Sequence, residues 1–381
     1  MKKYCVIILC AAMIFSLIAC NSTASNIQST EESCKQPTVD TFLPEAKNMA
    51  AVSVPTVTHE VTADDGTVLF RYTYQNIHLV LPEQEIADAV ILDFLNRIDS
   101  TQEHADSLMA QAEIAYAPSG NFLPYEYKLV YSPTRIDTGV LSFFGTTTVY
   151  SGGAHPTYDC AAANYDLLNG NVLTLGSILT HQDKLTQLET LLLAELKTME
   201  QEKYLRQDYD QIVSHRFDGE ESYDEDWYFT STGLCFYFPP YEIAPYSSGI
   251  ITAEIPYEKL IGIIDNAYFP PERIQTYSDV AAAHLDQNVL KERTQIAELP
   301  LTQNGEKFLL HTDGMIEDLK VIKTDPATMD STTLFLSQYL TPWDGVVLTL
   351  PQAELATLHI TYRSGNNSVT RPLPALVKAT A

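Results

Sequence analysis

The sequence YSGGAHP, Tyr150 to Pro156, ends one strand-like run, and FYFPPYEIAPYSSG, Phe236 to Gly249, follows much later in the chain. Two adjacent glycines after a strand permit positive φ and a close approach of the backbone. Three prolines stiffen the second segment, because each fixes its own φ. Loops built in this way hold side chains in place near one end of a sheet, so they suit recognition as well as folding.

Two interpretations of each loop stay open. His155 acts in recognition or as a general base, or its ring only bonds the local backbone of a strained turn. In the second loop, Tyr241 and Tyr246 are presented to a partner on a stiff backbone at low entropic cost. Alternatively, Ile243 and one of the tyrosines fold back and cover the sheet.

The hydrophobic pattern around these loops predicts an α+β fold. Residues 68–74 alternate as in a half-buried strand, and apolar residues recur every four positions over 86–98, as on one helix face. A long helix is expected from 183 to about 212. Further strands are expected at 127–133, 139–150, 161–167, 227–229, 234–238 and 250–255. The pattern lacks the β-α-β alternation of a parallel sheet, so we expect an antiparallel sheet packed with helices.

The character of the sequence changes after residue 270. A linker or helix is expected at 271–298, followed by a small all-β, sandwich-like domain at 299–381. Its strands are expected at 307–311, 319–322, 334–336, 346–350 and 358–363. The α+β domain is expected at 53–270, with a strand-helix half at about 53–125 and a half that carries the two loops at about 126–270.

The N-terminus, MKKYCVIILCAAMIFSLIAC, has the pattern of an export signal. Two lysines precede an apolar run that is too short to span a bilayer. The residues LIAC resemble the lipobox of bacterial lipoproteins, which implies a signal peptide at 1–19 and lipid attachment at Cys20. A flexible tether is expected at 20–52. We therefore expect a lipid-anchored protein in the envelope of a Gram-negative, Bacteroides-like bacterium, on the periplasmic face or outer surface of the outer membrane.

Charge and cysteine content limit the classes of partner. The chain has 49 acidic and 23 basic residues, a net charge of −26. Such a field repels nucleic acid and speeds the encounter with a basic partner. Cys34 falls in the tether, so Cys160 and Cys235 are left as a disulfide or as two buried free thiols.

Chemical signatures are missing from the sequence. The acidic stretch at 218–226 lacks the ligand spacing of a calcium loop, and we expect no metal and no cofactor. The motifs G-x-S-x-G, H-E-x-x-H and S-x-x-K and a Gly-rich phosphate loop do not occur. We therefore expect no catalytic residue, and a hydrolase or deacetylase that uses His155 is the least favoured alternative.

Several segments resemble one family in their order and spacing. They are Tyr150–Pro156, Asn164–Asp166, Phe236–Gly249 and Ile255–Tyr257. Together they are similar to the extracellular domain of RsiV-type anti-sigma factors, which sense lysozyme. Related domains occur beside PdaC-type deacetylases and in uncharacterised bacterial lipoproteins. The resemblance covers roughly 57–264 and does not account for the C-terminal β domain.

The resemblance implies a binding surface at the two loops. The candidate contacts that it implies are Ser151, Gly152, Gly153, His155, Pro240, Tyr241, Pro245 and Tyr246. The expected partner is lysozyme, a related muramidase or another basic protein, in agreement with the acidic charge. The alternative is peptidoglycan or another envelope glycan, with the same tyrosines stacked on sugar rings.

Overall fold

The computed structural model describes residues 50–378 except 118–119, 121, 218–225, 272–279, 286–292, 294, 303–304, 327–329 and 351–355. The predicted signal peptide, the lipid attachment at Cys20 and the tether up to residue 49 lie outside the described residues. Cys34 and most of the acidic stretch at 218–226 lie outside them as well.

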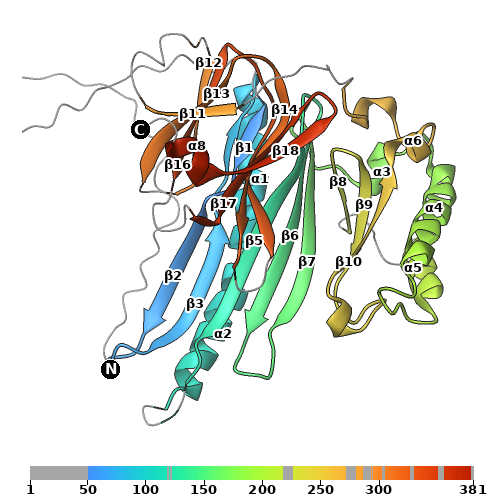
Figure 1. Ribbon diagram of the computed structural model, residues 1–381. Coiled ribbons are helices and arrows are strands. Elements are labelled where there is room, and N and C mark those ends of the chain that lie inside the picture. The colour runs from blue at the N-terminus through green and yellow to red at the C-terminus, as the bar shows by residue number, and fades with distance from the viewer. Residues whose placement is uncertain are drawn as a thin grey trace, which may run out of the picture. The chain divides into compact units, whose positions relative to one another are not determined.

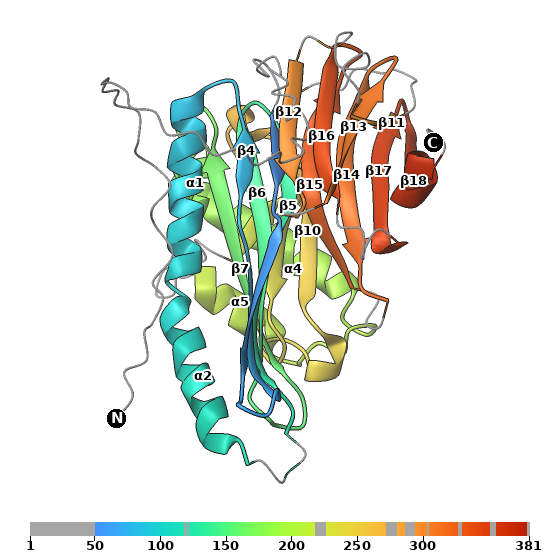
Figure 2. The ribbon, with the colours of Figure 1, turned by 90° about the vertical axis from the view of Figure 1, so that its left-hand side faces the viewer.

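A five-stranded sheet is the frame of the α+β part. Its strands, in spatial order, are β2 (Thr56–Thr62), β3 (Val68–Gln75), β5 (Tyr125–Ile136), β6 (Val140–Tyr150) and β7 (Thr157–Asp166). Helices α1 (Gln84–Asp99) and α2 (Gln102–Ala115) lie along one face of it (Figure 2). Val90, Phe94 and Ile98 of α1 are buried against the sheet, which confirms the helix predicted from the spacing of its apolar residues.

One pair of strands in this sheet is parallel. β3 and β5 run in the same direction, with Phe70 opposite Tyr125. Between them the chain passes through β4 (His78–Val80), α1 and α2, so it crosses one face of the sheet before it returns. The α+β class is confirmed, but the expectation of no β-α-β connection is wrong here, because two helices carry the chain back to the starting end of the sheet.

A smaller sheet follows, in the order β10-β9-β8. The hairpin of β8 (Trp227–Phe229) and β9 (Gly233–Phe238) confirms the prediction, and β10 (Ile251–Pro256) completes the sheet. Helices α4 (Leu185–Thr198) and α5 (Tyr209–Phe217) pack on it (Figure 1), together with the short helices α3 (Leu175–Ile178) and α6 (Tyr257–Leu260).

The helix predicted from 183 to about 212 is wrong in its continuity. α4 ends at Thr198, and turns separate it from α5. Within the break, the Arg206 amide donates to the carbonyl oxygen of Ile243 at 2.8 Å, and the Ser248 hydroxyl donates to that of Lys203 at 2.6 Å. These bonds tie the break to the loop between β9 and β10. Tertiary contacts therefore override the local helix propensity.

Two sheets packed face to face form the C-terminal β part. The four-stranded sheet contains β11 (Val280–His284), β13 (Glu306–Thr312), β16 (Asp344–Leu350) and β12 (Gln295–Pro300). The six-stranded sheet contains β18 (Asn367–Pro372), β17 (Leu358–Ser364), β14 (Ile316–Thr324), β15 (Ser331–Leu340), β1 (Ala51–Ser53) and β4. Both sheets contribute to one buried core, which confirms the predicted sandwich. Helix α8 (Leu373–Lys378) follows β18.

The prediction of a linker or helix at 271–298 is wrong where this stretch is described. β11 and the first part of β12 fall within it. The sequence of β11, VAAAH, is rich in alanine and favours a helix in isolation. Pairing with β13, in which Val280 lies opposite Thr312, holds it as a strand instead.

β1, at the start of the described chain, pairs with a strand of the C-terminal sandwich. It lies between β15 and β4, with Val52 opposite both Leu336 and Leu79. All three residues of β1 are completely buried, and the Ser53 hydroxyl donates to the carbonyl oxygen of Pro300 at 3.1 Å. Residues at the predicted junction of tether and α+β domain therefore complete a sheet of the C-terminal sandwich.

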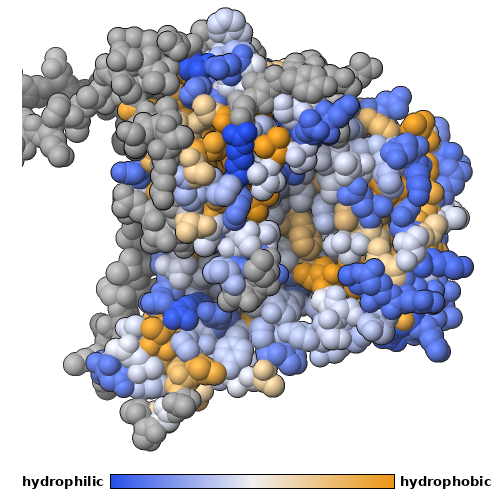
Figure 3. Space-filling view, viewed as in Figure 1, coloured by the Kyte–Doolittle hydropathy of each residue, from blue (hydrophilic) through white to orange (hydrophobic). Residues whose placement is uncertain are grey.

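The face over α4 and α5 is mainly hydrophilic (Figure 3), as expected for an acidic chain. Cys160 and Cys235 are free thiols, not a disulfide. No helix in the described part of the chain is both long and apolar enough to cross a membrane.

Candidate functional site

The two loops singled out in the sequence lie against each other. The first, residues 151–156 (the Gly-His loop), joins β6 to β7, and the second, residues 239–250 (the Tyr-Pro loop), joins β9 to β10. Four side chains meet where they touch, and we call His155, Tyr158, Tyr241 and Tyr246 the aromatic cluster. The ring centroid of Tyr246 lies 4.4 Å from that of His155, 5.5 Å from that of Tyr241 and 5.9 Å from that of Tyr158. Tyr246 is therefore the centre of the cluster, at distances typical of paired aromatic rings.

Tyr246 also ties the loops together through its polar end. Its hydroxyl donates to the carbonyl oxygen of Pro156 at 3.0 Å. Nδ1 of His155 lies 2.9 Å from the same oxygen, so His155 donates to the adjacent backbone when Nδ1 carries the proton. This is the local backbone bond that the structural interpretation of His155 expects.

Tyr241 is the exposed member of the cluster. Its side chain is 62% exposed, whereas Ile243, two residues later, is completely buried. Ile243 is therefore buried, as the second interpretation of the Tyr-Pro loop expects, and the ring of Tyr241 lies at the surface, where the first interpretation places it. Tyr241 has φ of 75°, and the left-handed region costs a residue with a side chain about 1–2 kcal/mol. Strained backbone of this kind gathers at ligand-binding sites.

The other predicted contacts shape the loops. Gly152 has φ of 82°, and a Cβ atom there would come within 3.0 Å of the Tyr125 ring, so this turn requires glycine. The exposed residues of the remaining set are Ser151, Gly153 and Pro245, and Pro240 is half-buried. The structure thus brings the rings of His155, Tyr241 and Tyr246 together, while the glycines and prolines set the backbone that carries them.

A network of charges lies behind the Tyr-Pro loop. Arg216, at the end of α5, forms ion pairs with Asp226, just before β8, and with Glu242. Burial, together with the carboxylates of Asp159, Glu242 and Asp226, raises the pKa of the nearby Cys160 thiol to about 12. Three carboxylates therefore act on one point of β7 near the aromatic cluster, and this neighbourhood is acidic.

Neither thiol is suited to nucleophilic chemistry. Burial raises the pKa of Cys235 to about 12 as well, so both side chains stay protonated at neutral pH. A reactive cysteine needs a lowered pKa and an electropositive neighbourhood, which is the opposite of what surrounds Cys160.

Side chains of the five-stranded sheet bond the backbone of the three-stranded sheet β10-β9-β8 and hold it in place. Asn164 Nδ2 donates to the Trp227 carbonyl oxygen at 2.8 Å, and the Phe229 amide donates to the Ser142 hydroxyl at 2.9 Å. The Thr134 hydroxyl donates to the Phe229 carbonyl oxygen at 2.6 Å. These bonds satisfy the free edge of β8, which would otherwise be buried unpaired. They explain why the Tyr-Pro loop is held beside β7.

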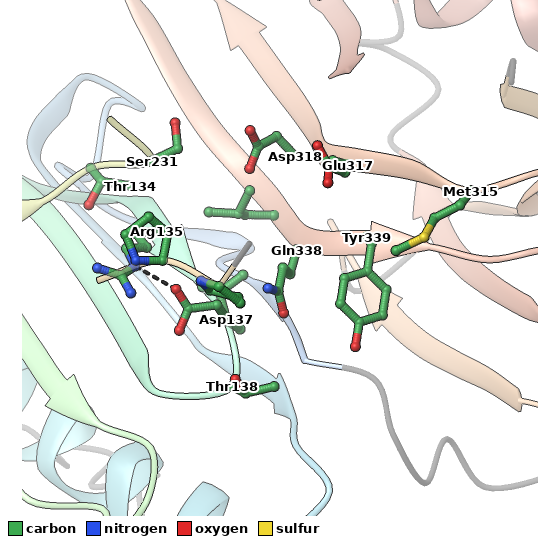
Figure 4. A pocket seen from close by; sticks show the side chains of 14 residues that line it. Thr134, Arg135, Asp137, Thr138, Ser231, Met315, Glu317, Asp318, Gln338 and Tyr339 are labelled. Carbon is green, nitrogen blue, oxygen red and sulfur yellow. Dashed lines mark hydrogen bonds and ion pairs between the residues drawn. The ribbon is translucent and has the colours of Figure 1, made fainter. Parts of the chain in front are cut away.

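A cavity of about 310 Å³ lies beside the turn between β8 and β9, and residues of the sandwich strand β15 also line it (Figure 4). Arg135 and Asp137 form a buried ion pair there, with Nε and Oδ2 2.6 Å apart. Arg135 also donates to the Tyr257 hydroxyl and to the Tyr268 carbonyl oxygen, each at 2.6 Å, and its guanidinium lies over the rings of Tyr257 and Phe229. The contacts of Arg135 are thus with the protein itself, which indicates a structural role.

Sequence reasoning missed Tyr158, Arg216 and Glu242. The strand expected at 161–167 begins four residues too late, which left Tyr158 outside any element. Arg216 and Glu242 are far apart in the sequence, and nothing in it signals that they pair. Glu242 lies inside the segment Phe236–Gly249, but the sequence assigned it no role of its own.

Fold and surface together define a class: an α+β protein with a β-sandwich and an exposed aromatic surface on two stiff loops. Residues 177–258 match the family model DUF3298, a protein family of unknown function. The matched segment contains the Tyr-Pro loop and not the Gly-His loop.

Two solved structures are similar to this chain. A DUF3298 family member from Bacteroides fragilis NCTC 9343 has 19% sequence identity and a TM-score of 0.44, and the match covers 58% of this chain and 96% of that one. A DUF3298 family protein from Pseudomonas aeruginosa PAO1 has 18% identity and a TM-score of 0.40, covering 61% and 99%. No curated protein matches the chain.

Proposed function

We propose that this chain is a lipid-anchored envelope protein of the RsiV-like type that binds a basic protein ligand, lysozyme or a related muramidase, through the aromatic cluster. The observation that carries the proposal is the meeting of two stiff loops, distant in sequence, around Tyr246. Folding alone does not require Tyr241, which remains 62% exposed in a strained backbone conformation. Exposed, ordered tyrosines are typical of binding hot spots.

The charges support a basic ligand. Asp159, Asp226 and Glu242 lie near the cluster, and the whole chain has a net charge of −26. A field of this sign attracts a basic protein and speeds its encounter with the site. Once the partners meet, binding rests on burial of Tyr241 and on water exclusion around it. The proposed role is steric, with the Tyr-Pro loop entering a cleft of the ligand.

The test is calorimetric titration of the form that begins at Asn21 with a c-type lysozyme at low and high salt. Tyr241→Ala removes an exposed ring that forms no side-chain hydrogen bond within the described part of the chain, so we expect a loss of about 2 kcal/mol or more, roughly a thirtyfold rise in Kd. Trp343→Ala is the matched control, because Trp343 is 63% exposed and lies in the sandwich. It should leave Kd unchanged.

The salt dependence of lysozyme binding and the effect of Tyr241→Ala test the proposed ligand and the proposed site. Binding of a basic ligand should weaken at high salt, because the carboxylates near the cluster are screened. Equal affinity in Tyr241→Ala and the parent protein would contradict the proposed site. If no heat is released at any salt concentration, lysozyme is not the ligand, and an envelope glycan becomes the leading candidate for the cluster.

A further inference from the structure

A second surface lies on the face of the five-stranded sheet that α1 and α2 leave uncovered. A groove of about 720 Å³ runs between this face and the ends of strands of the sandwich. Figure 2 shows the helices on one side of the sheet and the sandwich strands on the other. Six threonines line it, and we call it the threonine groove; they are Thr56, Thr58, Thr73, Thr148, Thr302 and Thr332.

Strand alternation places these side chains. Phe70 and Tyr72 of β3 are buried in the core with the helices, so Arg71 and Thr73 face the groove. The hydroxyl oxygens of Thr58 and Thr73, on neighbouring strands, lie 3.1 Å apart. Threonine hydroxyls on β2, β3 and β6, each able to donate and to accept a hydrogen bond, therefore line the floor beside the β5 residues Glu126, Lys128 and Val130.

The charges in the groove are balanced. The charged residues that line it are Arg71, Lys128 and Lys323, together with Glu126, Asp325 and Asp330. Arg71 is already paired, at 2.7 Å from Glu60 and 3.5 Å from Glu126. In a chain with a net charge of −26, three cations and three anions make a locally neutral surface. This charge balance favours a neutral, strongly hydrogen-bonding ligand over a basic protein.

One end of the groove reaches the aromatic cluster. Tyr158 lines the groove, is 38% exposed and packs at a tilt against Tyr246. An aromatic face beside an array of hydroxyls is complementary to a sugar chain, because a pyranose has apolar C–H faces and a rim of hydroxyls. A peptide that adds a strand to the edge of β2 would need apolar pockets at alternate positions, and the threonines do not provide them.

We propose that the threonine groove binds a neutral, linear glycan segment, with Tyr158 stacked against one sugar ring. The inference does not rest on the proposal for lysozyme, because its ligand is uncharged and its threonines lie outside the aromatic cluster; the two surfaces share only Tyr158 among the residues of that cluster. It predicts binding that is insensitive to salt, since no net charge is screened.

Chitotetraose and cellotetraose, titrated separately into the form that begins at Asn21, are the neutral probes. We expect at least one of them to bind with an affinity that salt leaves unchanged. The double variant Thr58→Val with Thr73→Val keeps the shape of the side chains and removes two hydroxyls, and it should weaken binding at least tenfold. Thr252→Val, at an exposed position of β10, is the matched control and should bind like the parent.

The outcomes separate this inference from the proposed function. Loss of glycan binding in the double variant, with lysozyme binding kept, supports the groove. Failure of both oligosaccharides to bind overturns the inference, whatever lysozyme does. Unchanged affinity in the double variant, or affinity lost at high salt, overturns it equally.

Discussion

Two tyrosines of one loop have different tasks. Tyr246 is half-buried, packs at a tilt against three rings and donates to the Pro156 carbonyl oxygen, so it holds the Gly-His loop and the Tyr-Pro loop together. Tyr241 is exposed and packs at a tilt against Tyr246 alone among the described rings. A tyrosine that fixes the loops and a tyrosine available to a ligand can therefore be separated by substitution.

Removal of single hydroxyls tests this division. Tyr246→Phe loses the bond to Pro156 and should lower the free energy of unfolding by about 0.5–1.5 kcal/mol. Tyr241→Phe is the matched control, and its effect should stay within about 0.5 kcal/mol, because the ring is at the surface. Urea denaturation followed by circular dichroism measures both. Equal effects of the two changes would show that Tyr246 does not tie the loops.

At the scale of elements, side chains attach the three-stranded sheet β10-β9-β8 to the five-stranded sheet. Asn164, Ser142 and Thr134 of the five-stranded sheet form hydrogen bonds with the backbone of β8. The contact between the sheets also buries Cys235 and most of Cys160 among Phe144, Tyr228 and Tyr237. The two thiols therefore report on the integrity of this contact.

Thiol reactivity tests the contact. Burial raises the pKa of both thiols to about 12, which lowers the thiolate fraction at pH 8 by about a thousandfold. The Cys34→Ser form that begins at Asn21 contains only these two thiols. It should react with an aromatic disulfide reagent at least tenfold more slowly when native than in urea.

The same shifts have a consequence for stability. The folded state keeps the thiols protonated to higher pH than the unfolded chain does, so their contribution is complete below pH 9 and is lost as pH rises toward 12. In the Cys160→Ala, Cys235→Ala variant, stability should fall less over this interval. Rapid native reaction of both thiols at pH 8 would show that the contact between the sheets is open.

At the scale of the whole molecule, the first strand of the described chain forms part of the C-terminal sandwich. β1 lies between β15 and β4, and its three residues are fully buried. Leu336 of β15 belongs to the core of α1 and α2, while Phe335 belongs to the core of the sandwich. The six-stranded sheet is thus shared by both cores, and we expect the described chain to unfold as one cooperative unit.

Removal of β1 tests this dependence. A form that begins at Val57 leaves the edge of β15 unpaired, and amide hydrogen exchange in β15 should rise strongly compared with a form that begins at Met49. The amides of β13, in the four-stranded sheet, are a second reporter, and their exchange should rise together with that of β15 if the described chain unfolds as one unit. Unchanged exchange in β15 would mean that β1 contributes no stability to the sandwich.

Local patterns made much of the fold predictable. The apolar stripe of α1, the hairpin of β8 and β9, and the strands of the sandwich depend on alternation, periodicity and turn residues, which are properties of neighbouring positions. The stiffness of the two loops was visible for the same reason, because glycine and proline act on their own backbone.

The tertiary structure decided what depends on distant partners. The alanine-rich β11 is a strand because β13 pairs with it, and the helix after Thr198 breaks because Arg206 and Lys203 bond the Tyr-Pro loop. The insertion of β1, the pairing of Arg216 with Glu242 and the meeting of His155 with Tyr246 follow the same rule. Such contacts join residues between which the sequence has no periodic relation, so only the folded chain brings them together.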